Sequence, residues 1–124
     1  MELNAEGMHD WLDQATDAML DSLNFGVVGL DKQGNACRYN AVESSMSGLS
    51  QESVLHRHFF EEIAPCMNNV LVAKRLEEAQ AKHEILDATI DYVLAFRSKK
   101  TDVKIRMLHS KDSAFRYLLI HCLE

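Results

Sequence analysis

Residues 25–39, FGVVGLDKQGNACRY, consist of two short apolar segments separated by a polar turn that contains a glycine. The first segment is Phe25–Leu30, and the second is Ala36–Tyr39, which can pair back on the first across the DKQGN turn. This pattern predicts a β-hairpin. Two glycines in the first segment, Gly26 and Gly29, weaken a strand and therefore indicate that another element approaches its backbone closely.

Upstream of the hairpin, residues 5–22 have apolar side chains at helical spacing, with acidic residues on the opposite side. The members of the apolar face are Trp11, Ala15, Ala18, Met19 and Leu23. We therefore expect a single amphipathic helix that docks on the domain through this face. In that organisation residues 1–24 form an N-terminal helical cap, and residues 25–124 form one domain.

Short turns follow the hairpin over residues 39–65. Asn40 can cap a helix over about 41–46, and Ser50 can cap a single helical turn. A chain of short turns usually wraps either the core or a ligand. This segment is therefore where we look for a binding site.

The second half of the chain predicts one longer helix and three strands. Asn68 or Asn69 can cap the helix, which covers about 70–82. The strands are separated by polar turns, the first at Arg97–Thr101. They cover about 84–94, 103–109 and 115–123. With the hairpin, these elements predict an α+β fold: a central antiparallel sheet of about five strands, with short helices and one longer helix on one face, plus the N-terminal helix.

Composition limits the possible partners. The 124 residues are 47% hydrophobic and 26% charged, which is typical of one globular domain. The net charge of -6 argues against binding to nucleic acid or to an anionic membrane, since both need a basic face. No apolar run is long enough to span a membrane, and the first twenty residues carry five acids without a Lys or Arg, unlike a secretory signal. We therefore expect a cytoplasmic protein.

The cysteines and histidines indicate no metal centre. The chain has three cysteines, Cys37, Cys66 and Cys122. They are odd in number and show no CxxC spacing, so we expect neither a disulfide framework nor a thiolate zinc site. His56 and His58 stand at alternate positions, but Arg57 between them disfavours a cation, and solvated loop histidines are the expected state.

Residues 59–68, FFEEIAPCMN, contain the only proline of the chain, Pro65, directly followed by Cys66. Taken alone, Cys66 is either a small buried residue or a point of covalent attachment. Tyr39 and Glu43 stand four residues apart where a helix begins, which places both on one face. A hydroxyl and a protonated carboxyl group side by side offer two hydrogen-bond donors. The spacing alone, however, favours a partly exposed tyrosine and a solvated glutamate.

Taken together, these residues resemble the photoactive yellow protein family, blue-light receptors of the PAS fold. The family's spacing is held without a gap from Phe25 to Cys66, and the resemblance extends from about Leu20 to the C-terminus. The shared residues are Phe25-Gly26, Leu30-Asp31, Gly34-Asn35, Tyr39-Asn40-Ala41, Glu43, Gly48, Phe59-Phe60, Ala64-Pro65-Cys66, Asp91-Tyr92 and Val103-Lys104.

The resemblance implies a p-coumaric acid chromophore joined to Cys66 as a thioester. In the family, the buried phenolate accepts hydrogen bonds from a tyrosine and a protonated glutamate, roles that fall on Tyr39 and Glu43, with Ser47 supporting the tyrosine. Signalling in the family runs through trans-to-cis photoisomerisation, proton transfer from the glutamate and partial unfolding. The N-terminal helix is the element that we expect to be released.

Several positions depart from the family pattern. Where well-known family members have an arginine that covers the chromophore ring, this chain has Leu49. Ala88 stands in place of a tyrosine, and Leu94 stands in place of a methionine that is associated with rapid dark recovery. The loop after Tyr92 is longer, and Arg97 is a candidate substitute lid. Together with Ser47, the residues expected to support the pocket are Leu49, Phe59, Leu94 and Arg97. From Leu94 we expect slow thermal recovery.

Three functions are compatible with these residues. The first is a blue-light receptor with a covalent chromophore, acting on a downstream signalling protein as a monomer or weak homodimer. The second is a PAS-type interaction module without a chromophore, acting by dimerisation or non-covalent ligand binding. The third is a thiol enzyme that uses Cys66, but no histidine is tied to this cysteine by sequence, and an enzyme needs a base. We therefore expect no enzyme activity.

Overall fold

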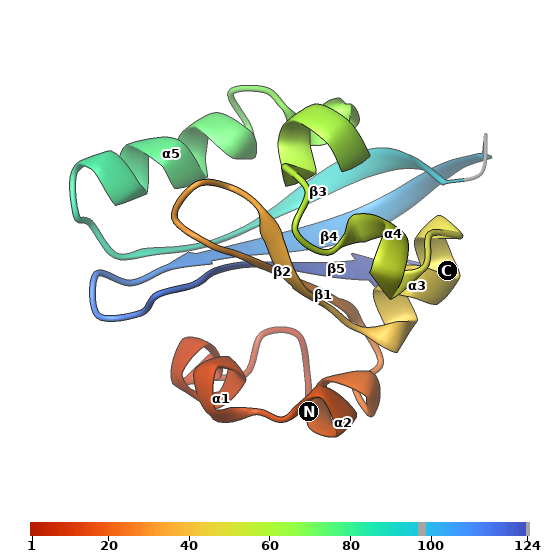
Figure 1. Cartoon of the computed structure of the whole chain (residues 1–124), viewed down its shortest axis with the longest axis horizontal. Coiled ribbons are helices and arrows are strands. Elements are labelled where there is room, and N and C mark those ends of the chain that lie inside the picture. The colour runs from red at the N-terminus through yellow and green to blue at the C-terminus, as the bar shows by residue number, and fades with distance from the viewer. Residues whose placement is uncertain (97–98, 124) are drawn as a thin grey trace.

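The computed structural model describes residues 1–96 and 99–123. Within them, five antiparallel strands form one sheet in the order β2-β1-β5-β4-β3 (Figure 1). The strands are β1 (Gly26–Leu30), β2 (Ala36–Tyr39), β3 (Leu86–Phe96), β4 (Lys99–His109) and β5 (Arg116–Cys122). The predicted α+β fold with a sheet of about five strands is therefore confirmed. None of the helices in this part of the chain is long and apolar enough to cross a membrane.

Strands β1 and β2 form the predicted hairpin. Asp31 closes the turn locally, because its Oδ1 accepts hydrogen bonds from the backbone N–H groups of Gln33 (3.0 Å) and Asn35 (2.9 Å). Gly34 adopts a φ of 87°, a conformation that favours glycine. The hairpin could be predicted from the sequence because its turn depends on the Asp31 hydrogen bonds and the Gly34 conformation, which involve only neighbouring residues.

Helices cover both faces of the sheet (Figure 1). Two N-terminal helices, α1 (Met8–Gln14) and α2 (Asp17–Asp21), lie on one face. The other face packs against α3 (Ala41–Ser47), α4 (Gln51–Val54) and α5 (Ala73–Ala81), together with a π-helical turn at Phe59–Ile63 and a 3₁₀ turn at Pro65–Met67. Alternation along the strands produces two cores: Val27 belongs to the N-terminal core, and its neighbour Val28 belongs to the other.

The prediction of one helix over residues 5–22 is wrong. The helix ends after Gln14, and a second one begins because Thr16 caps it, with Oγ1 accepting a hydrogen bond from Met19 N (3.2 Å). The break also rotates the buried face. Ala15 and Leu23 are buried as expected, whereas Met19 is exposed. Ala18 is exposed and Trp11 only partly buried. The main anchors are instead Met8, Leu12 and Leu20.

The short helices α3 and α4 match the prediction and begin at the expected caps. Asn40 accepts from Glu43 N (3.0 Å), and Ser50 accepts from Ser53 N (3.2 Å). Helix α5 begins at Ala73, three residues later than predicted. Asn69 caps the turn before it, with Oδ1 accepting from the N–H groups of the two residues that precede Ala73.

The turn predicted at Arg97–Thr101 is too long. Strand β4 begins at Lys99, which pairs with Phe96 of β3, so residues 99–101 are strand. Their polar character indicated a turn, but pairing with the long β3 partner decides their conformation. Arg97 and Ser98 lie outside the described residues.

Candidate functional site

A cavity of about 100 Å³ lies between α3, the 59–67 segment and β3. It is lined by Tyr39, Glu43, Ser47, Leu49, Phe59, Ile63, Ala64, Cys66, Met67, Leu94, Ala95 and Phe96. Seven of the eight residues predicted for the site therefore come together at this cavity. The eighth, Arg97, lies outside the described residues, so its expected role as a lid stays a prediction.

Asn40 positions the donor side of the cavity. Its Oδ1 accepts from Glu43 N at the start of α3 and from Val27 N in β1 (2.9 Å), while its Nδ2 donates to the carbonyls of Leu20 (2.8 Å) and Phe25 (3.1 Å). The sequence indicated Asn40 only as a helix cap. In the fold it also ties α3 to the sheet and to the end of the N-terminal segment.

Glu43 is a buried acid with an unsatisfied oxygen. The residue is 2% exposed, and its Oε1 has no hydrogen-bond partner among the described residues. Burial raises the pKa of the carboxyl group to about 8, so it holds its proton at neutral pH. The expectation of a solvated glutamate, which the spacing alone favoured, is therefore wrong. A buried carboxyl oxygen without a hydrogen-bond partner is rare in folded proteins.

Tyr39 forms the second polar group of the cavity. Its hydroxyl donates to Ser47 Oγ (2.7 Å), and Ser47 Oγ in turn accepts from Leu49 N (3.2 Å). Burial, and next the charge of Glu43, raise the pKa of Tyr39, so the phenol stays neutral. Because both hydroxyls rotate, Ser47 can instead donate to Tyr39, which leaves the tyrosine proton available to a ligand.

Cys66 lines the same cavity as a free, exposed cysteine. Pro65 begins the 3₁₀ turn that carries it, a position where no backbone N–H is needed. Tyr92 on β3 holds this turn, because its hydroxyl donates to the Cys66 carbonyl (2.7 Å). Asn69 Nδ2 donates to the same carbonyl at 3.3 Å. The sequence did not indicate that Tyr92 braces the turn that carries Cys66.

The thiol of Cys66 is not activated. Burial is the main cause that raises its pKa, so the protonated form predominates at neutral pH. A protonated thiol is a weak nucleophile, so acylation of this thiol would require an acyl donor that is already activated.

Apolar side chains complete the cavity. Leu94 and Phe59 are each 1% exposed and form its buried wall, whereas Leu49 is 38% exposed. Leu49 therefore lies on the open side, where it covers the cavity less than a long side chain would. In the described part of the chain, no group of three or more His, Cys, Asp or Glu side chains is arranged to hold a metal ion.

A five-stranded antiparallel sheet with short helices around a small cavity defines a PAS-type sensor domain, and the family model described as PAS fold matches residues 14–120. Photoactive yellow protein from Rhodothalassium salexigens is 36% identical over 91 residues, covering 73% of this chain and 72% of the relative. Photoactive yellow protein from Halochromatium salexigens is 31% identical over 107 residues, covering 86% of this chain and 85% of the relative.

The same relationship appears among solved structures. The photoactive yellow protein domain of the sensor histidine kinase Ppr from Rhodospirillum centenum superposes with a TM-score of 0.82 at 31% identity, covering 90% of this chain and 97% of that domain. The chain therefore belongs to the photoactive yellow protein family. It is a PAS sensory module rather than an enzyme.

Proposed function

We propose that this protein is a blue-light receptor that carries p-coumaric acid as a thioester on Cys66. The observation that supports this function best is the buried Glu43 carboxyl group, which lines the cavity and has an unsatisfied oxygen. Tyr39 and Cys66 line the same cavity. This arrangement suits an aromatic acid with a phenolate at its far end. Cys66 can hold the acyl group, Tyr39 and Glu43 are neutral hydrogen-bond donors, and the remaining wall is apolar.

When bound, the p-coumaroyl group supplies a phenolate that absorbs blue light and isomerises from trans to cis. Tyr39 and Glu43 are the residues that donate hydrogen bonds to the phenolate oxygen, and Ser47 orients the Tyr39 hydroxyl. Phe59 and Leu94 exclude water and keep Glu43 protonated. These roles rest on the burial of the two donors and on the hydrogen bond between Tyr39 and Ser47.

The signal arises from the charge that Glu43 acquires. If its carboxyl group gives its proton to the phenolate oxygen of the bound group, the carboxylate that remains is at a position that is 2% exposed and has no cation within ion-pair distance among the described residues. A buried, unpaired charge is strongly destabilising, and partial unfolding relieves it. The segment released is residues 1–24, which a downstream signalling protein then recognises.

Loading of the apo-protein with activated p-coumaric acid tests this function. We expect a blue-absorbing band that bleaches under illumination, and a mass increase corresponding to one coumaroyl group. Cys66→Ala should form no adduct. Cys37→Ala is the control, because Cys37 is also a free cysteine, although it is less exposed than Cys66, and its thiol donates to the Gly29 carbonyl (3.3 Å) away from the cavity.

Two outcomes would reject the covalent function. One is a wild-type protein that forms no adduct, which would favour the PAS module that binds a ligand non-covalently or dimerises. The other is an adduct that persists in Cys66→Ala. Glu43→Gln provides a further check, because a weaker donor to the phenolate should shift the band to longer wavelength.

A further inference from the structure

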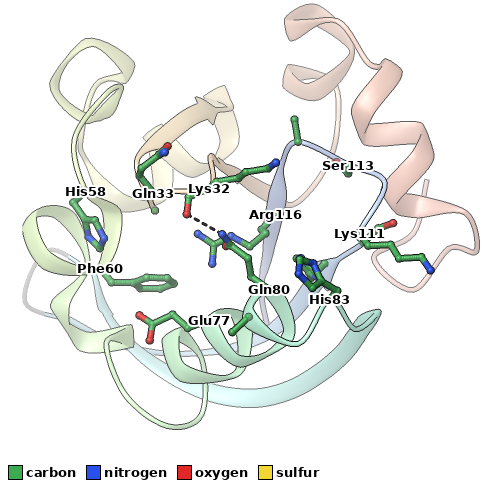
Figure 2. Close-up of a pocket in the computed structure, with 15 residues that line it drawn as sticks. Lys32, Gln33, His58, Phe60, Glu77, Gln80, His83, Lys111, Ser113 and Arg116 are labelled. Atoms are coloured by element: carbon green, nitrogen blue, oxygen red, sulfur yellow. Dashed lines mark hydrogen bonds between the residues drawn. The ribbon is translucent and has the colours of Figure 1, made fainter.

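A second and larger pocket lies away from Cys66, between the β1–β2 turn, helix α5 and the β4–β5 turn (Figure 2). Its volume is about 500 Å³, and it shares no lining residue with the cavity of Tyr39 and Glu43. Figure 2 shows Arg116 and Gln80 in the middle of this pocket, with His58 and Phe60 on one side and His83 on the other. The pocket is therefore a separate feature of the molecule.

The charge of this pocket is opposite to that of the whole chain. Its lining includes the cations Lys32, Lys111 and Arg116 but only one carboxylate, Glu77. Its histidines are His58, His83 and His109. The chain as a whole carries a net charge of -6. A concave surface with excess positive charge in an acidic protein attracts anions.

Arg116 is the central residue of the pocket. It is 6% exposed, its Nη2 donates to the Asp31 carbonyl (3.0 Å), and its Nε is buried without a hydrogen-bond partner among the described residues. No carboxylate described in the structure lies within 4.0 Å of it. The Asp31 side chain accepts hydrogen bonds within its own turn, and the charges of Glu77 and Asp31 act on Arg116 only at longer range. A buried guanidinium without a counter-ion is costly unless an anion joins it.

The pocket is braced around this arginine. Gln80 Nε2 on α5 donates to the Lys32 carbonyl (3.0 Å), which ties the helix to the β1–β2 turn (Figure 2). The neighbouring histidine His109 is held by its Nδ1, 2.6 Å from the Glu84 carbonyl. These contacts hold the pocket walls in place without using the charge of Arg116.

We propose that this pocket binds a small oxyanion ligand, a carboxylate or a phosphate, whose oxygens pair with the Arg116 guanidinium while Lys32 and Lys111 add longer-range attraction. The planar guanidinium matches either group in a two-point hydrogen-bonded geometry. The ligand is therefore a second chemical input to the sensor, independent of the cavity at Cys66.

Titration of the apo-protein with inorganic phosphate and, separately, with benzoate tests this proposal at constant ionic strength. Amide chemical shifts should change saturably at residues 32–34 and 110–116. Arg116→Lys should weaken binding at least about tenfold, because the ammonium group lacks the planar two-point geometry. Phosphate and benzoate distinguish the two sources of the oxyanion, and binding of either one supports the site.

Two milder variants keep the test valid if Arg116→Lys folds poorly. Glu77→Gln removes the only carboxylate of the lining and should tighten binding about two- to fivefold, whereas Lys32→Gln should weaken it by a similar factor. Lys74→Gln is the matched control: it changes the net charge equally, but Lys74 lies outside the pocket. The proposal is overturned if neither probe saturates, or if Lys74→Gln weakens binding as much as Lys32→Gln.

Discussion

The Oε1 atom of Glu43 lies directly against the backbone of Gly26, so that a β-carbon at position 26 would overlap it. Because Gly26 has no side chain, strand β1 leaves room for the buried Glu43 carboxyl group of helix α3. The close approach expected from this glycine is confirmed, and its partner is the acid of the candidate site.

We expect Gly26→Ala to displace Glu43. Overpacking should lower the free energy of unfolding by about 1–3 kcal/mol, and the loaded protein should absorb at longer wavelength because the carboxyl group moves from its place. Gly29→Ala is the matched control in the same strand, since its β-carbon would meet the Arg38 side chain instead (2.9 Å). Identical absorption bands in the two loaded variants would contradict this relationship.

The stability of the apo-protein should depend on pH through Glu43. Its folded-state pKa is about 8, above the ordinary value of 4.5, so the folded state retains a proton that the unfolded state loses. Stability should therefore fall as pH rises from about 4.5 to 8, by at most about 1.4 kcal/mol per pH unit from this group. Denaturant unfolding at pH 5 and pH 8 measures the effect.

Glu43→Gln isolates this contribution, because an amide does not titrate in this range. The variant should gain stability relative to wild type between pH 5 and pH 8, whereas exposed Glu52→Gln should track wild type. A constant difference between wild type and Glu43→Gln across this range would show that Glu43 is already ionised at pH 5.

Ser47→Ala should loosen Tyr39. The variant removes the partner of the tyrosine hydroxyl, so we expect a stability loss of about 1 kcal/mol and a small shift of the loaded protein to longer wavelength. Ser44→Ala is the control on the same helix, because its hydroxyl donates to the Leu49 carbonyl (2.6 Å) rather than to Tyr39. If Ser44→Ala shifts the absorption band by the same amount, the shift does not depend on the hydrogen bond between Ser47 and Tyr39.

Leu94→Met should accelerate dark recovery after a flash. Leu94 is 1% exposed and lines the cavity where the family resemblance places a methionine, so the substitution restores a side chain associated with rapid recovery. The volume of the two side chains is similar, which keeps the stability change below about 1.5 kcal/mol. Val93→Met is the control, because Val93 is exposed and outside the cavity. Time-resolved absorption measures the recovery rates. Equal rates in wild type, Leu94→Met and Val93→Met would refute a role of position 94 in recovery.

Arg38→Met should loosen the N-terminal cap in the dark. The Arg38 guanidinium donates to the carbonyls of Leu12 (2.7 Å) and Ala15 (2.5 Å), where α1 ends. Losing hydrogen bonds to a charged group costs about 1.5–3 kcal/mol, so amide exchange in α1 and α2 should rise roughly ten- to hundredfold.

The control for this cap variant is Arg57→Met. Arg57 pairs with Glu62 on the exposed surface, so its loss should leave exchange in α1 and α2 unchanged. Unchanged exchange in Arg38→Met itself would mean that the apolar contacts alone hold the cap.

Local chemistry explains which elements the sequence predicted well. Asp31 closes the hairpin turn, Asn40 and Ser50 cap their helices, and all three act on residues two to four positions away. The N-terminal break is also local, since Thr16 caps α2, but the continuous apolar spacing masked it. Strand β4 is different, because its start at Lys99 depends on pairing with Phe96 rather than on its own polar residues.

Neighbouring residues are sufficient to predict the hairpin and the helix caps, and the family resemblance identified seven residues that line the cavity. The folded arrangement of the chain sets the protonation state of Glu43, because burial against Gly26 raises its pKa, and no spacing along the chain shows burial. It likewise brought Tyr92 to the Cys66 carbonyl across 26 residues, and Arg116 to the Asp31 carbonyl across 85 residues. Short-range hydrogen bonds depend on residues that are close in the sequence and can therefore be predicted from it. Desolvation and long-range contacts exist only once the sheet and both helical layers have assembled.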